Sequence, residues 1–172
     1  MTTVILYGNA QDSVYDDINS LMSNYGITTF DGEKLSQNNG GGDFLFIKRS
    51  EPLILDLPKG IIVFLNKIDK VFNLKIPKGF TAITRSENSA ALKVLKTIGI
   101  NAITCGMASV DTLTLSSVLE DSVLVSLQRE IQTLSGKTLE PAEFPIKVSK
   151  SYSEYGILAA CGILLLSENI KI

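Results

Sequence analysis

The stretch FTAITRSENSAALKVLKTIGINAITC, residues 80–105, indicates the fold of this chain. Phe80–Thr84 is an apolar run rich in residues that favour strands. Asn88 is suited to cap a helix whose apolar residues recur on one side, and Gly99 supplies a left-handed stop. Ala102–Cys105 then resumes as a strand. A strand, a helix and a strand of these lengths predict two parallel strands joined by a right-handed crossover.

The same alternation continues toward the N-terminus. Val4–Tyr7 predicts a buried strand, and Ile61–Leu65 is apolar on both faces, which is typical of a central strand of a parallel sheet. Between them, Asp12 and Ser13 both offer an N-cap oxygen at the start of a helix, and Ser13 with Asp16 has the spacing of a capping box. We expect Gly26 to end that helix.

A polar segment, residues 33–42, interrupts this pattern. It ends in three consecutive glycines, so we expect a mobile loop. Further strands are predicted on either side of it, at Ile27–Phe30, Phe44–Ile47 and Leu53–Leu57.

Toward the C-terminus the hydrophobic period changes to two, with turn residues between short segments. The predicted strands are Leu113–Ser116, Val123–Leu127, Ile131–Leu134 and Phe144–Val148. Such alternation favours an antiparallel meander with one packed face. A last helix begins at a capping box of Ser151 and Glu154 and is apolar nearly all round, so we expect it to be heavily buried.

The chain has 172 residues, which fits a single α/β domain spanning residues 1–172. We expect a mixed sheet with a parallel, Rossmann-like core, an antiparallel meander in the C-terminal half, and flanking helices. Hydrophobic residues make up 45% and charged residues 20%, which argues against disorder.

Charge and residue usage exclude several classes of function. Sixteen Lys and Arg against eighteen Asp and Glu give a net charge of −2, so the chain lacks the basic surface of a general nucleic-acid binder. Histidine is absent, which removes the commonest proton shuttle and metal ligand. The most apolar stretch, residues 156–166, is too short to cross a bilayer, and no signal peptide is recognised. We expect a cytoplasmic protein that binds neither membranes nor nucleic acid.

Two features resemble catalytic or metal sites. Cys105 ends a predicted strand, but without an imidazole to stabilise its thiolate we expect a buried, structural thiol, like Cys161. Asp111 and Glu120 are candidate Mg²⁺ ligands, although acidic residues in turns are usually solvated. We therefore predict no catalytic residue, no metal site and no cofactor.

Asn66-Lys67-Ile68-Asp69 matches the N-K-x-D pattern with which P-loop GTPases recognise guanine. Those proteins also need a G-x-x-x-x-G-K-[ST] loop to hold the phosphates, and the chain contains no such run. Guanine-nucleotide binding through Asn66–Asp69 is therefore kept only as an alternative.

If the chain has a ligand site, we expect it where the parallel strands end, since ligands of open α/β sheets bind at the carboxyl edge. The residues predicted to converge there are Gly8, Asn9, Asn66, Arg85, Ser86 and Gly106. Arg85 is the natural contact for a small anionic ligand.

From Phe80 onward the order of elements resembles the closing half of the central domain of the Mur ligases. Thr84–Asn88 takes the place of the family's Asn-Asp-Asp region, and Thr104–Gly106 that of its strand ending in Tyr-Gly or Phe-Gly. The meander covers Thr112–Val148, and Ser151–Ala160 opens the Ala-Ala-rich helix.

The Mur ligases are ATP-dependent enzymes that add amino acids to the peptidoglycan precursor. This chain lacks the family's Gly-Thr-x-Gly-Lys-[Ser/Thr] loop and its His-Asn pair. The resemblance therefore implies a non-catalytic relative in a bacterial cytoplasm that binds a partner protein, a second copy of itself or a small ligand, with a link to cell-wall precursors. A split ATP-dependent ligase, whose P-loop lies on another chain, is the main alternative.

Overall fold

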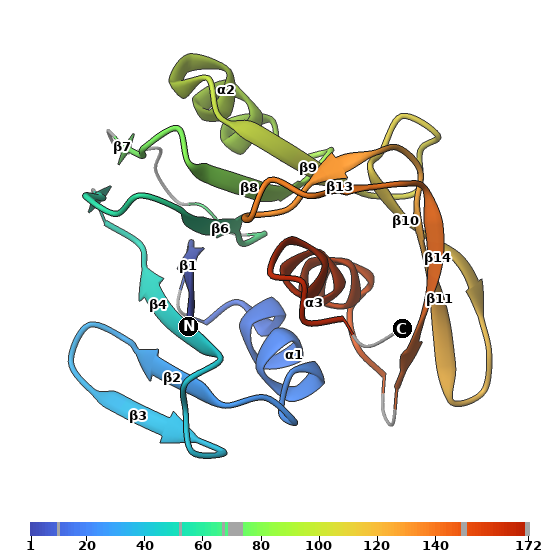
Figure 1. The fold of residues 1–172 in the computed structure, drawn as a ribbon, viewed down its shortest axis with the longest axis horizontal. Helices are drawn as coiled ribbons and strands as arrows, with labels where there is room; N and C mark the ends of the chain where they lie inside the picture. Colours follow the sequence, from blue (N-terminus) through green and yellow to red (C-terminus); the bar gives the residue numbers. More distant parts are fainter. Residues whose placement is uncertain (10, 52, 67, 69–73, 149–150, 171–172) are drawn as a thin grey trace.

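Most of the strands that the structure describes form one large mixed sheet (Figure 1). The computed structural model describes residues 1–9, 11–51, 53–66, 68, 74–148 and 151–170. Within this part of the chain, the strands of the large sheet are β1 Thr2–Tyr7, β2 Ile27–Phe30, β3 Leu35–Asn38, β4 Phe44–Arg49, β6 Gly60–Phe64, β8 Phe80–Arg85, β9 Asn101–Cys105, β10 Leu113–Val118, β11 Ser122–Leu127 and β14 Ala142–Lys147. Two small strand pairs lie outside it, β5 Leu53–Ile54 with β7 Leu74–Lys75, and β12 Ile131–Gln132 with β13 Thr138–Leu139.

The order across the large sheet is β14-β11-β10-β9-β8-β6-β1-β4-β2-β3. Neighbours from β9 to β2 are parallel, and β3, β11 and β14 are antiparallel to their neighbours. The expected α/β fold, with a parallel core and antiparallel strands toward the C-terminus, is confirmed.

The unit at residues 80–105 folds as predicted. Its helix, α2, spans Ser89–Ile98 and joins the parallel strands β8 and β9. Oδ1 of Asn88 accepts from the Ala91 amide at 3.0 Å, and Gly99 ends the helix with a φ of 71°. Both ends are therefore fixed by the residues that the sequence pattern pointed to.

Helices cover both faces of the sheet (Figure 1). Helix α1, Ser13–Leu21, and helix α3, Glu154–Leu166, pack on one face, where Leu6 and Val63 belong to the same core as both helices. Helix α2 packs on the other face, above Tyr7 and Phe64. Adjacent residues of β1 and β6 thus point into different cores, as the pleat requires.

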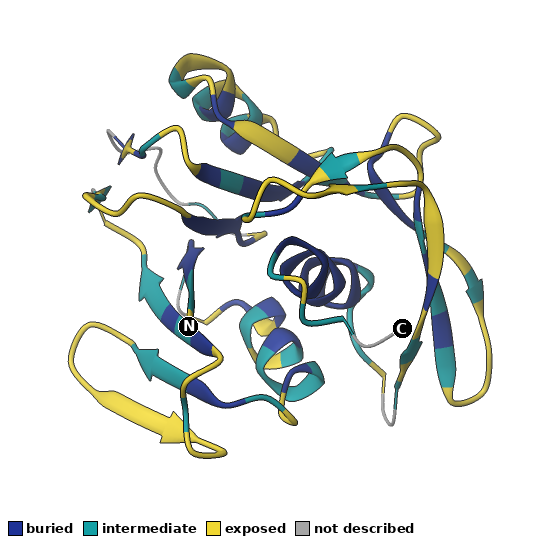
Figure 2. Ribbon diagram, in the orientation of Figure 1, coloured by how far each residue is buried: buried dark blue, intermediate teal, exposed yellow. Residues whose placement is uncertain are grey.

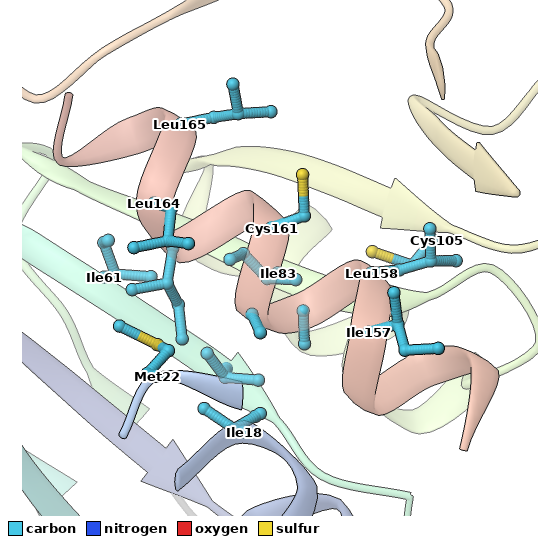
Figure 3. Close-up of a cluster of buried hydrophobic side chains, with 14 of the residues drawn as sticks. Ile18, Met22, Ile61, Ile83, Cys105, Ile157, Leu158, Cys161, Leu164 and Leu165 are labelled. Atoms are coloured by element: carbon cyan, nitrogen blue, oxygen red, sulfur yellow. The ribbon is translucent and has the colours of Figure 1, made fainter. Parts of the chain in front are cut away.

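Helix α3 is buried from Tyr155 to Leu166, as expected from its composition (Figure 2). The sheet faces one side and α1 lies beside it, while β10, β11 and β14 continue round its remaining side (Figure 1). Figure 3 shows side chains of α3, among them Ile157 and Leu164, in one cluster with Met22 beside α1 and with Ile61 and Ile83 of the sheet. No helix in the described ranges is long and apolar enough to cross a membrane.

Residues 33–42 differ from the expected mobile loop. Leu35–Asn38 forms β3, an exposed strand that pairs with β2 from Ile27 opposite Asn38 to Phe30 opposite Leu35. Gly40, Gly41 and Gly42 have φ values of 77°, 61° and 107° and make the turn that follows. Polar residues form a strand here because the free edge of β2 supplies the hydrogen-bond partners.

Several helix boundaries also differ from the prediction. Of the two N-cap candidates at the start of α1, Asp12 is the cap and Ser13 is the first helical residue, while Ser153, not Ser151, caps α3. Helix α1 ends at Leu21, so Gly26 is no helix stop. Gly26 instead leads into β2, where the carbonyl of Gly41 approaches so closely that no Cβ would fit.

The predicted meander is formed by β10, β11 and β14, but Ile131–Leu134 does not join it. Ile131–Gln132 pairs with β13 in a separate hairpin. Strand β14 closes the sheet with Pro145 opposite Leu124. The Leu124 carbonyl accepts from Ser116 Oγ of β10, so the nitrogen of Pro145 faces the open edge, where a proline removes no ladder bond.

Candidate functional site

Four adjacent parallel strands end at one edge of the sheet and bring the predicted residues there. Strands β9, β8, β6 and β1 are neighbours in this order. The predicted residues occupy or follow their carboxyl ends: Gly8 and Asn9 after β1, Asn66 after β6, Arg85 and Ser86 at the end of β8, and Gly106 after β9. All six lie along one edge; whether they bind a ligand stays a prediction.

The direction of the chain reverses between β1 and β6. From β1 the chain passes through α1 to β2, on the side of β4, whereas β6, β8 and β9 follow one another on the other side. Helices α1 and α2 lie on opposite faces. In open α/β sheets, ligands bind in the crevice outside such a switch point.

A cavity of about 440 Å³ opens beside this point, between the end of β6 and the start of α2. It is lined by Asn66, Arg85, Glu87, Asn88, Ser89 and Ala90. The guanidinium of Arg85 lies 3.2 Å from the Glu87 carboxylate in an exposed pair, with side chains 38% and 81% exposed. Nδ2 of Asn88 donates to the Leu65 carbonyl at 3.3 Å and so ties the start of α2 to the end of β6.

A second, smaller cavity of about 50 Å³ lies between the ends of β1 and β4, lined in part by Gly8, Lys48 and Arg49. Nζ of Lys48 lies 3.0 Å from the centroid of the Tyr15 ring, a cation–π contact. Backbone amides of Lys34 and Glu33, together with Lys48, hold the pKa of Asp31 below its ordinary value. The apolar run of this strand predicted an end at Ile47, so neither cation was among the predicted site residues; the Lys48-Arg49 pair that follows the run was the available signal.

The loop after β9 is built around Gly106 and Asp111. A Cβ at Gly106 would lie 2.5 Å from Oδ2 of Asp111 and 2.8 Å from Oγ of Ser86, so only glycine fits. Asp111 is fully buried; its Oδ2 accepts from the Ala108 amide at 3.0 Å, while Oδ1 has no hydrogen-bond partner among the described residues.

Asp111 and Glu120, the candidate Mg²⁺ ligands, are not brought together. They lie beyond opposite ends of β10, Asp111 buried and Glu120 exposed in the turn before β11. Across the residues that the structure describes, no three His, Cys, Asp or Glu side chains are arranged to hold a metal ion.

Both cysteines are buried free thiols, as expected. Burial raises the pKa of Cys105 well above its ordinary value, with smaller contributions from Cys161 and Asp111, and raises that of Cys161 to about 12. Such thiols remain protonated near neutral pH and are poor nucleophiles.

Tyr155, in the first turn of α3, is also buried at this edge. Its hydroxyl donates to the Phe64 carbonyl at 2.7 Å, with the Ile83 carbonyl at 3.3 Å. Burial raises the pKa of Tyr155 well above its ordinary value. The neutral phenol therefore anchors α3 to the ends of β6 and β8.

The structure places only part of the guanine-recognition pattern. Asn66 lines the larger cavity, but Lys67 and Asp69 lie outside the described residues. The sequence has a single Gly-Lys pair, Gly136-Lys137, and it forms the turn between β12 and β13. Amides of both residues donate to Thr133, at 3.0 and 3.1 Å, so this turn does not form a phosphate loop.

No protein-family model and no curated protein matches the sequence. Among solved structures, the UDP-N-acetylmuramoyl-L-alanyl-D-glutamate–2,6-diaminopimelate ligase is similar over 98% of this chain and 43% of its own, with a TM-score of 0.56 and 9% identity. The murein peptide ligase Mpl from Neisseria meningitides is similar over 95% of this chain and 60% of its own (TM-score 0.57, 10% identity). MurF from Thermotoga maritima, solved with ADP, is similar over 97% of this chain and 45% of its own (TM-score 0.52, 13% identity).

The chain has a Mur ligase-like fold. The similarity covers nearly the whole chain, so it extends well beyond residues 80–172, where the sequence patterns placed it. Conversely, the chain spans only 43 to 60% of the length of these ligases. At 9 to 13% identity the comparison establishes the fold alone, and activity has to be argued from the chain's own residues.

Proposed function

We propose that this Mur ligase-like chain binds a small anionic ligand at the carboxyl edge of its parallel strands and does not hydrolyse ATP by itself. The observation that carries the proposal is the cavity of about 440 Å³ beside the switch point, where Asn66 and Arg85 line the same hollow. Ligand sites of open α/β sheets are found at this position.

The lining suits a phosphate or a carboxylate. Arg85 offers a planar fork of N–H donors, and the amide of Asn66 adds a neutral donor and acceptor. The first turn of α2 adds the backbone amide of Ala90 at a helix N-terminus, whereas the Ser89 amide already donates to the Glu87 carbonyl at 2.9 Å. In the free protein the Glu87 carboxylate forms an ion pair with the Arg85 guanidinium. Because Glu87 is largely exposed, an incoming anion can displace its carboxylate at a small cost in free energy.

Two features support the absence of ATP hydrolysis. Phosphoryl transfer depends on positioning and charge neutralisation of the phosphates, which a P-loop supplies through its backbone amides and lysine. The turn after β1, Gly8 to Asp12, contains one glycine and no lysine. The Gly136-Lys137 pair belongs to a hairpin whose amides already have acceptors.

The proposed ligands follow from the similar structures. Their names describe ligases acting on UDP-N-acetylmuramate and its peptides, which are anionic nucleotide sugars. We therefore propose a role connected with cell-wall precursors in a bacterial cytoplasm, with such a precursor as the first ligand to test.

Isothermal titration of the full chain with UDP-N-acetylmuramate, ATP–Mg²⁺ and GDP tests this proposal; GDP covers the guanine alternative. We expect one of the anions to bind, and Arg85→Gln to weaken that binding about tenfold or more, since a hydrogen bond to a charged group contributes roughly 1.5–3 kcal/mol. Lys96→Gln, in the last turn of α2 and away from the cavity, is the matched control. Absence of binding by all three would contradict the ligand site, and ATP turnover by the purified chain would contradict the non-catalytic role.

A second candidate is a subunit of a split ligase. The observation that favours it is the ligase fold over nearly the whole chain without a phosphate loop of its own. Purification from native cells should then recover a P-loop ATPase bound to this chain, and repeated recovery of the chain alone would remove the candidate.

A further inference from the structure

The large sheet is split between β9 and β10. The two strands pair at a single position, Cys105 opposite Leu113. The Thr104 carbonyl accepts from the Thr112 amide at 2.9 Å, and the Gly106 amide donates to the Leu113 carbonyl at 3.2 Å. Main-chain groups of every second residue of β9 therefore point toward β10. Those of Ala102 point the same way, but β10 does not extend that far, and no other described strand pairs with this side of β9.

A cavity of about 340 Å³ opens at this gap, at the amino ends of β8 and β9 and therefore at the opposite end of these strands from the proposed anion site. It is lined by β8 and β9 residues, by Leu166 at the end of α3, and by the β12–β13 hairpin. Ala102 pairs with Ala82, and paired residues of a sheet have their side chains on the same face. Because Ala82 belongs to the core under α2, the side chain of Ala102 also lies on that face. Ala102 therefore presents its main chain to this cavity on the α3 side.

The far wall of the cavity is fixed. The amide of Leu134 donates to the Leu166 carbonyl at 2.9 Å, and Nζ of Lys59 donates to the Leu134 carbonyl at 3.3 Å. Oγ1 of Thr133 donates to the Glu168 carboxylate at 2.7 Å. These bonds hold the β12–β13 hairpin to the end of α3, so the gap beside β9 exists before any ligand arrives.

We propose that this gap binds an extended peptide segment of a partner protein, which adds as a strand along β9. An added strand would form hydrogen bonds with the free N–H and C=O of Ala102. The side-chain amides of Asn101 and Gln132 can form further hydrogen bonds with the backbone of the added strand. Among the described residues that line the cavity, Glu130 is the one charged side chain, and it is exposed, so it favours a lysine or arginine in the peptide. The described lining residues include no cation for a phosphate and no aromatic ring on which a base or sugar would stack, and Lys59, behind the hairpin, already donates to the Leu134 carbonyl.

The test is an NMR titration of the ¹⁵N-labelled full chain with acetylated, amidated tetrapeptides that alternate Val and Thr and carry one Lys at each position in turn. At saturation we expect the Ala102 amide signal to shift and its hydrogen exchange to slow at least tenfold. The same peptides with N-methylated amides keep the side chains but lose the backbone donors, and they should not bind.

Glu130→Gln should weaken binding of the Lys peptides about threefold, the scale of an exposed ion pair. Glu33→Gln, an exposed acid in the turn between β2 and β3, is the matched control and should have no effect. The proposal is overturned if no peptide shifts the Ala102 signal at millimolar concentration, or if N-methylated peptides bind equally well. It is also overturned if a dimer of this chain protects Ala102 without peptide. None of these outcomes bears on the anion site.

Discussion

Helices α2 and α3 pack on opposite faces of the same sheet but are buried to very different extents. Only Ala91 and Leu95 of α2 are buried, whereas α3 is buried from its second residue to its last (Figure 2). The difference lies in their neighbours. Helix α2 packs on the sheet along one stripe, whereas α3 also has α1 beside it and the strands β10, β11 and β14 around it.

This comparison explains why the two helices differ in sequence. A helix with one covered side needs an amphipathic pattern, and α2 has one. A helix covered on every side has no position where a charge is tolerated, and after Glu154 the helix α3 carries none. The free energy of folding should accordingly depend more on α3 than on α2.

The largest expected effect is that of Leu158→Ala in α3. Leu158 is 0% exposed and surrounded by fixed neighbours, so the cavity left by the substitution cannot collapse (Figure 3). We expect a loss of about 4 kcal/mol in the free energy of unfolding, measured by urea denaturation. Leu119→Ala, at an exposed hairpin tip, is the control and should change it by less than about 0.5 kcal/mol.

Leu95→Ala makes the same change in α2. Leu95 is 4% exposed, and its neighbours Val94 and Ile98 are only partly buried, so the site can relax. We expect a smaller loss, about 2.5 kcal/mol, by the same measurement. A loss equal to that of Leu158→Ala would break the comparison, because it would mean that α2 is as firmly enclosed as α3.

Alkaline pH tests the enclosure of α3 in another way. The pKa of Cys161 is about 12 in the folded chain and near its ordinary value of 9.0 in the unfolded chain. The stability from keeping this thiol neutral is fully present below pH 9 and is lost as the pH rises toward 12, because the unfolded chain releases the proton first. At pH 10 the loss is about 1.4 kcal/mol.

Urea denaturation at pH 8 and pH 10 measures this loss. The free energy of unfolding of Cys161→Ala should fall less steeply with pH than that of the wild type. The difference should equal the contribution of the Cys161 thiol alone, because Cys105 and the other groups titrate in both proteins. Equal slopes would show that Cys161 ionises as easily in the folded chain as in the unfolded one.

The smallest expected effect concerns the start of α2. Asn88→Ala removes the acceptor for the Ala91 amide and the donor to the Leu65 carbonyl. We expect a loss of about 1 kcal/mol, the usual cost of an N-cap. Thr97→Ala, near the other end of α2, is a control that leaves the cap intact; if it costs as much as Asn88→Ala, the cap is not what stabilises this end of α2.

The sequence predicted best what depends on local signals and on strand direction. The unit at residues 80–105 carries its own caps and apolar stripe, so its fold needs no distant information. The six residues from Gly8 to Gly106 could be placed at one edge because the carboxyl ends of parallel strands always coincide. The burial of α3 followed from its composition alone.

The features that the sequence did not predict depend on pairing between strands that are distant in the chain. β3 has no apolar pattern, and it is a strand only because β2 offers it an edge. The gap beside Ala102 arises because β10 meets β9 at one residue, which no local pattern encodes. Lys48 was missed because β4 continues beyond its apolar part, with its last residues held by register to β1.

The two outer strands of the sheet differ in how readily another chain can pair with them. At β14, the nitrogen of Pro145 faces outward and offers no donor, which discourages another chain from pairing there. At β3, the exposed strand contains neither proline nor charge. Two molecules that paired through β3 would each leave β14, with Pro145 facing outward, as the outer strand of the joined sheet, so pairing between outer strands would stop at two molecules.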